Sequence, residues 1–249
     1  MKKVDKNTYH LALQESLFLL KKDLINFKFV ALLGSVRERE HIPVYSDLDI
    51  LFVIKSADDG VIDFGLLMRL KKICSILSKN YDIKISFLTH TEKDFIEYVA
   101  YEYLVHYSFG KVLYGNKQAF SRFFNVLISN KKPTKRGLVK EMYLATIHAR
   151  FNLVRKFVSL NIHNTRQYRQ ELEKIFIDNL FEIADWRLIS ENIWCKSKKE
   201  IMQKITEVSN SKYSFVLNDA YKYRNSWGTL MVKEADSEVF LKNGIFFIN

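Results

Sequence analysis

The chain has few of the residues that mark special architectures: 2 cysteines, 2 prolines and 8 glycines among 249 residues. Two cysteines cannot build a disulfide framework, nor a four-ligand zinc site without other ligands. So little glycine and proline excludes collagen-like and linker-rich chains. No apolar run approaches the roughly 18 residues of a membrane-spanning helix. The start of the chain contains no uninterrupted apolar segment typical of a signal peptide, so we expect a cytoplasmic, reduced protein without membrane contact.

The amino-acid composition is typical of a folded protein, with an excess of positive charge. Apolar residues make up 48% and aromatic residues 14%, enough for a sizeable core. Lysine and arginine total 39 against 28 aspartates and glutamates, a formal net charge of +11. This charge fits binding of nucleic acid or another polyanion. It fits equally well a background rich in Lys, Ile, Asn, Phe and Tyr, so nucleic acid stays open as a partner.

Hydrophobic periodicity predicts strands and helices in the first part of the chain. We expect strands at 28–33, 47–54, 81–88 and 111–114, and helices at 8–25, 62–78 and 91–107. Asn7 can cap the first helix. Thr91 and Asp94 have the spacing of a capping box.

The second part of the chain has helical periodicity almost to its end. Helices are predicted at 137–160, 166–192, 198–209 and 212–225, and the apolar tail segments 239–241 and 245–248 fit a strand or an extended arm. The predicted class is α+β, a small mixed sheet with helices over residues 1–118 followed by an all-helical domain over 119–249.

The pattern that points to chemistry lies at the ends of two apolar strands. Gly34 and Ser35 follow the first, where glycine permits a sharp turn and brings backbone N–H groups close to a ligand. Asp47 and Asp49 begin the second, and alternation along a strand puts both carboxylates on one face. Paired carboxylates suit Mg²⁺, which binds one or two of them together with substrate phosphates. The two segments together predict a site for phosphoryl chemistry.

Gly-Ser, a polar loop of some ten residues and then Ser-Asp-x-Asp on an apolar strand resembles the DNA polymerase β-like nucleotidyltransferase superfamily. That superfamily includes small antibiotic-modifying and minimal nucleotidyltransferases with helical C-terminal domains. The resemblance extends from residue 28 to about 115. It implies a polymerase β-like palm, two Mg²⁺ ions, an NTP substrate, for which we expect ATP, and release of pyrophosphate. It also implies that Gly34, Ser35 and Ser46 bind the nucleotide, and that Asp47 and Asp49 bind the metals.

The resemblance implies a third carboxylate on the strand beside the aspartate pair, and two residues compete for that position. Asp82 fits when Tyr81-Asp-Ile83 is aligned with the family pattern, and it is our choice for the third metal ligand and catalytic residue. Asp82 also fits a turn residue after Lys79-Asn80. The alternative alignment puts Lys84 there, and its positive charge would oppose a second cation and weaken or abolish catalysis.

Two further residues are assigned to the site, and each also has an interpretation without a functional role. Arg37, in the loop between the motif halves, can meet a triphosphate or be an ordinary surface charge. Glu141 can act as a general base on an acceptor hydroxyl, or belong to the solvated face of an amphipathic helix. The basic clusters 131–136 and 196–199 can track a nucleic-acid backbone or be cap and linker charges.

The predicted function is therefore Mg²⁺-dependent transfer of a nucleoside monophosphate from an NTP to an acceptor hydroxyl. The acceptor stays open among a small molecule such as an antibiotic, an RNA and a protein. A polycationic acceptor fits the positive chain poorly. The alternative is a catalytically weak or inactive nucleotide-binding module, for example one half of a toxin–antitoxin-like pair. A homodimer also stays open.

Overall fold

The computed structural model describes residues 4–43, 45–55, 62–159, 165–209 and 214–227. Contacts divide the chain into two units, Met1–Lys132 and Pro133–Asn249. The division falls later than the predicted boundary after residue 118, because helix α6 (Lys117–Lys131) belongs to the first unit. Its Phe120, Phe124 and Leu127 are buried with residues of the sheet.

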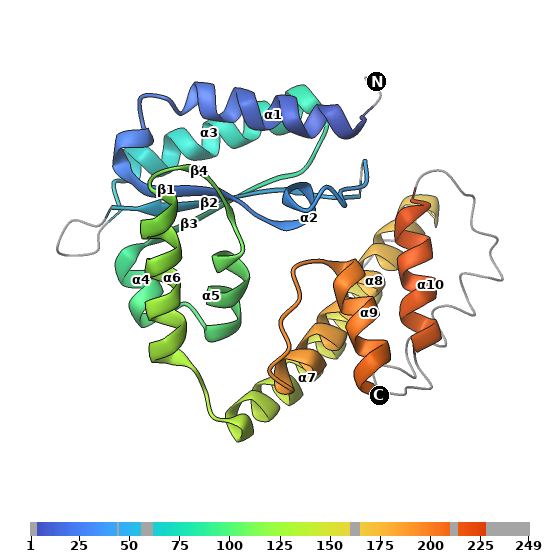
Figure 1. Ribbon diagram of the computed structural model, residues 1–249. Coiled ribbons are helices and arrows are strands. Elements are labelled where there is room, and N and C mark those ends of the chain that lie inside the picture. The colour runs from blue at the N-terminus through green and yellow to red at the C-terminus, as the bar shows by residue number, and fades with distance from the viewer. Residues whose placement is uncertain (1–3, 44, 56–61, 160–164, 210–213, 228–249) are drawn as a thin grey trace. The chain divides into compact units, whose positions relative to one another are not determined.

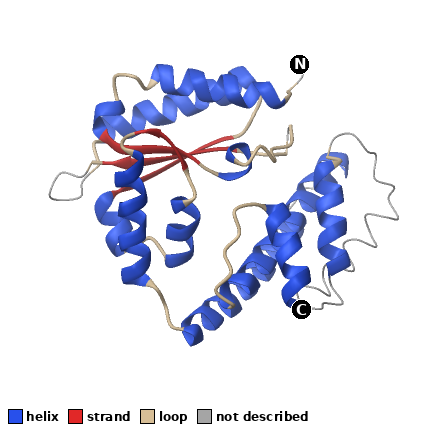
Figure 2. Cartoon of the chain, viewed as in Figure 1, coloured by secondary structure: helices blue, strands red, loops and turns tan. Residues whose placement is uncertain are grey.

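The first unit is built on a four-stranded mixed sheet in the order β3-β2-β1-β4. Its strands are drawn in red in Figure 2, with helices above and below them. Its strands are β1 (Phe27–Leu32), β2 (Leu48–Ile54), β3 (Ile85–Thr91) and β4 (Lys111–Tyr114). β1 pairs antiparallel with both β2 and β4, whereas β2 and β3 are parallel. The α+β class with a small mixed sheet and a helical second part is confirmed.

Both faces of the sheet are covered by helices, so the central strands β1 and β2 are apolar on both sides (Figure 1). Helices α1 (Lys6–Leu19) and α3 (Phe64–Tyr81) cover one face, over side chains such as Leu48, Ile50 and Phe52. Helices α4 (Glu92–Glu97), α5 (Tyr101–Ser108) and α6 cover the other, over Leu51 and Val53. The alternation along β2 thus separates two cores.

Several element boundaries differ from the sequence prediction. α1 begins one residue earlier than the predicted cap, since Asp5 rather than Asn7 caps it, and a 3₁₀ turn η1 (Leu24–Asn26) follows it. The predicted helix 91–107 is interrupted between α4 and α5, although its capping box of Thr91 and Asp94 is confirmed. A four-residue helix, α2 (Gly34–Arg37), occupies the start of the polar loop.

The second unit consists, in its described part, of four helices: α7 (Lys135–Ser159), α8 (Thr165–Ser190), α9 (Lys198–Ser209) and α10 (Ser214–Asn225). α8 contacts each of the other three. Its buried apolar side chains include Phe176, Leu180 and Leu188. The four predicted helices are confirmed, and the tail segments 239–241 and 245–248 lie outside the described residues. Among the described helices, none has the length and apolar character that a membrane crossing requires.

Candidate functional site

The turn at Gly34 brings the two halves of the motif into contact. The Leu33 N–H donates to the Asp49 carbonyl oxygen at 3.0 Å, which continues the β1–β2 pairing toward the start of β2. Gly34 itself is exposed and has φ +64°. A Cβ atom at this position would lie 2.7 Å from Asp49 Oδ2. The Asp49 carboxylate therefore lies directly against the Gly34 backbone, in space that only glycine leaves open.

Lys84 lies beside Asp47 at the same end of the sheet. The Leu48 N–H donates to the Lys84 carbonyl oxygen at 2.9 Å, and Asp49 is paired with Ser86. Lys84 Nζ is 2.5 Å from Asp47 Oδ2, with the Asp47 side chain 21% exposed and the Lys84 side chain 70% exposed. Of the two residues considered for the third position, Lys84 is the one whose side chain contacts Asp47.

Asp82 is not on the strand where the sequence analysis placed it. α3 continues to Tyr81, and Asp82 follows as its C-terminal cap with φ 55°. A short polar side chain tolerates this left-handed conformation better than most residues do. β3 then starts at Ile85. Asp82 therefore ends a helix, as in the alternative of a turn residue.

Tyr107 on α5 is a site neighbour that the sequence analysis missed. Its side chain is buried, and its ring stacks on Tyr103 at 6.1 Å between centroids. Burial raises the Tyr107 pKa to about 12, and the negative charges of Tyr103 and Asp49 add to the effect. The phenol therefore keeps its proton at neutral pH, which makes it a hydrogen-bond donor near Asp49 rather than a base.

Ser46 and Arg37, both assigned to nucleotide binding, make contacts within the protein. Ser46 is buried, and its hydroxyl oxygen accepts a hydrogen bond from the Ile42 N–H at 2.8 Å. The Arg37 guanidinium donates to the Phe109 carbonyl oxygen and pairs with Glu38. Burial lowers the Arg37 pKa, and Glu38 opposes that effect. These contacts give both side chains a role in shaping the loop.

Helix α1 holds the loop that joins Gly34 to Asp47. The Tyr9 hydroxyl donates to the Ser46 carbonyl oxygen at 2.9 Å, and this bond is buried. The His41 ring lies 5.0 Å from the Tyr9 ring, and His41 Nε2 is 3.3 Å from the Lys6 carbonyl oxygen. The segment before Asp47 is therefore fixed by residues close to the N-terminus.

Comparisons with known proteins give no family for this chain. No family model matches it, and no curated protein matches it. A solved structure described as "Crystal structure of the toxin-antitoxin with AMP-PNP" is 18% identical over 51% of this chain and 86% of that chain, with a TM-score of 0.34. Similarity at this level assigns neither fold nor function.

The other assigned residue, Glu141, is exposed on α7 in the second unit. The aspartate pair belongs to the first unit, and the role of Glu141 as a general base stays a prediction. Across the described ranges, no three or more His, Cys, Asp or Glu side chains group in a way that could hold a metal ion. A cation bound at this site would therefore have Asp47 and Asp49 as its protein ligands and would take the others from substrate phosphates or water.

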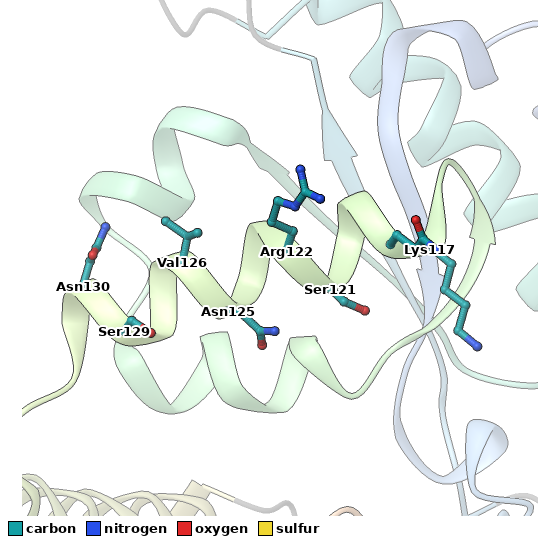
Figure 3. A pocket seen from close by; sticks show the side chains of 8 residues that line it. Lys117, Ser121, Arg122, Asn125, Val126, Ser129 and Asn130 are labelled. Atoms are coloured by element: carbon teal, nitrogen blue, oxygen red, sulfur yellow. The ribbon is translucent and has the colours of Figure 1, made fainter.

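A separate pocket lies along α6 (Figure 3). Its described lining comes from one face of that helix and includes Lys117, Arg122, Asn125 and Val126. None of these residues belongs to the motif that contains Gly34, Asp47 and Asp49.

His90 on β3 makes the stability of the protein depend on pH. Its ring lies 5.2 Å from the Phe95 ring and 5.8 Å from the Tyr107 ring. Burial lowers the His90 pKa from its ordinary value of 6.5, whereas the Asp94 charge opposes the shift. The unfolded chain therefore binds a proton more readily than the folded one, and stability falls as the pH drops through about 6.5.

We expect the His90→Gln variant to lose less stability than the wild type between pH 7 and pH 5. The measurement is the free energy of unfolding from urea titrations at several pH values. His90→Asn, a second variant that removes the imidazole, should show the same smaller loss. A His90→Gln profile parallel to that of the wild type would show that His90 protonation is not linked to folding.

Proposed function

We propose that the chain is a Mg²⁺-dependent nucleotidyltransferase that binds an NTP at Gly34, Ser35, Asp47 and Asp49. The observation that carries the proposal is the approach of the Asp49 carboxylate to the exposed Gly34 backbone, with Asp47 two residues earlier. The motif's resemblance to the polymerase β-like superfamily also supports it. The proposed reaction transfers a nucleoside monophosphate to an acceptor hydroxyl and releases pyrophosphate.

The donor set fits a magnesium ion that carries nucleotide phosphates. Two aspartates offer hard oxygen ligands, and Mg²⁺ in proteins takes one or two carboxylates with the rest of its shell from phosphate and water. When bound, it would neutralise phosphate charge. Gly34 lets phosphate oxygens approach the backbone without meeting a side chain. Asp47 and Asp49 therefore hold the ion, while Gly34 and Ser35 bind the phosphates.

Isothermal titration calorimetry with Mg-ATP and the other three Mg-NTPs tests the proposal. The wild type should bind, and the Asp47→Asn/Asp49→Asn variant should bind at least about 100-fold more weakly, a loss of roughly 2.7 kcal/mol. Asp219→Asn, on α10, removes a carboxylate elsewhere and should bind like the wild type. Absence of binding to every Mg-NTP, or equal binding by the double variant, contradicts the proposal.

A second function, nucleotide binding with weak or no catalysis, is favoured by one observation. The Lys84 ammonium lies on Asp47, where it opposes additional positive charge. Such a module, as one half of a toxin–antitoxin-like pair, would bind Mg-NTP in the same titration. A pyrophosphate-release assay with small-molecule, RNA and protein acceptors separates the two functions, because only a transferase releases pyrophosphate.

A further inference from the structure

We propose that the Lys84 ammonium takes the place of a second divalent cation, so that this site binds one divalent ion with the nucleotide instead of two. The proposal rests on the proposed nucleotide site and specifies its metal content. It replaces the two Mg²⁺ ions that the motif resemblance implies with one Mg²⁺ and one built-in cation.

Strand pairing places Lys84 beside the aspartates. β2 and β3 are parallel, and the bond from the Leu48 N–H to the Lys84 carbonyl oxygen lies just before their first pair, Leu48 and Ile85. Lys84 Nζ then reaches Asp47 Oδ2 at 2.5 Å. Ser86, two residues after Lys84 and inside β3, is paired with Asp49. Residues 84–86, which lie opposite the aspartate pair, thus carry an ammonium and a hydroxyl but no carboxylate.

The charge balance at the site suits a single divalent ion. Two carboxylates and one ammonium leave one net negative charge, which a single Mg²⁺ ion can offset while the nucleotide phosphates complete the ligand shell of that ion. A second divalent ion on Asp47 would have to approach a positive charge already in contact with that carboxylate. Like charges at such separations repel appreciably even in a high effective dielectric. Lys84 therefore determines how many cations the site accepts.

Manganese titration into the full-length protein, saturated with a non-hydrolysable ATP analogue, measures the metal content. Free Mn²⁺ is followed by electron paramagnetic resonance. The wild type should bind one Mn²⁺ per chain. Lys84→Ala should gain a second Mn²⁺ or bind Mn²⁺ about tenfold more tightly, and Lys84→Glu should bind two. Lys72→Ala, which removes the same charge from α3 on the other face of the sheet, should match the wild type.

The outcomes separate this proposal from the one it rests on. Two Mn²⁺ ions on the wild type with bound analogue would overturn the single-ion proposal and leave the nucleotide site standing. Unchanged Mn²⁺ binding by folded Lys84→Ala and Lys84→Glu would overturn it as well. No analogue binding by the wild type would instead overturn the nucleotide site itself. Lys84→Gln supplies a second neutral variant if Lys84→Ala fails to give the wild-type circular dichroism spectrum, and the same outcomes apply to it.

Discussion

The Phe95→Ala variant is expected to lower the free energy of unfolding by about 3–5 kcal/mol. Phe95 on α4 is 0% exposed. Its ring lies 5.4 Å from the Phe124 ring, 5.7 Å from the Phe123 ring and 5.9 Å from the Tyr107 ring. Truncation leaves a cavity between α4, α5 and α6. Since domains are typically stable by about 5–15 kcal/mol, this loss is a large part of the total.

Guanidinium titration followed by circular dichroism measures this loss. The neighbouring Ile96→Ala is the matched control, because Ile96 is 59% exposed and should change stability by no more than about 0.5 kcal/mol. Similar effects of the two substitutions would contradict the packing of α4 described above. A large loss for Phe95→Ala alone would show that packing of this aromatic cluster, which includes Tyr107 of α5, stabilises the fold.

The Gly34→Val variant is expected to lose both stability and nucleotide affinity. A β-branched residue at φ +64° is strained, and such backbone strain costs about 1–3 kcal/mol. The new side chain would also displace Asp49 Oδ2, since even a Cβ atom would lie 2.7 Å from it. We expect a lower melting temperature together with at least about tenfold weaker Mg-ATP binding by calorimetry.

Gly65→Ala is the control for the substitution at Gly34. Gly65 lies in the first turn of α3, where an added methyl group would meet only side-chain atoms of Asp63 and Arg69 at 3.1 Å or more. Alanine is also the better helix former there. This variant should keep wild-type affinity and stability. Wild-type nucleotide affinity in folded Gly34→Val would remove Gly34 from the proposed site.

Local sequence pattern predicted the strands that carry the site, because each contains an apolar run long enough to be buried. It did less well where two elements meet. The burial of Ile83 and Ile85 around exposed Lys84 follows the predicted alternation. The helix before them nevertheless extends to Tyr81, so Asp82 caps it. Alternation shows which side chains are buried, but it does not show where a helix ends.

The sequence predicts those features of the site that follow from residues close together in the chain or from the alternation of side chains along a strand. Gly34 beside Asp49 follows from two apolar strands paired antiparallel. The contact between Lys84 and Asp47 depends on the register of β2 against β3, which the sequence left open as a choice between two alignments. Tyr107 reaches the neighbourhood of Asp49 through packing of α5 on the sheet, and nothing local to Tyr107 marks it.

The hydrogen bond from Tyr9 to Ser46 bears on how this protein can be dissected. The β1–β2 hairpin contains every residue proposed to bind phosphate or Mg²⁺ directly, yet the loop within it depends on a hydroxyl from α1 for one of its buried carbonyl groups. A fragment limited to the hairpin, or a graft of it onto another scaffold, would carry the motif without the anchor that shapes it. A fragment that keeps the shape of the site therefore needs α1 as well as the hairpin, and one that keeps the proposed metal content also needs Lys84.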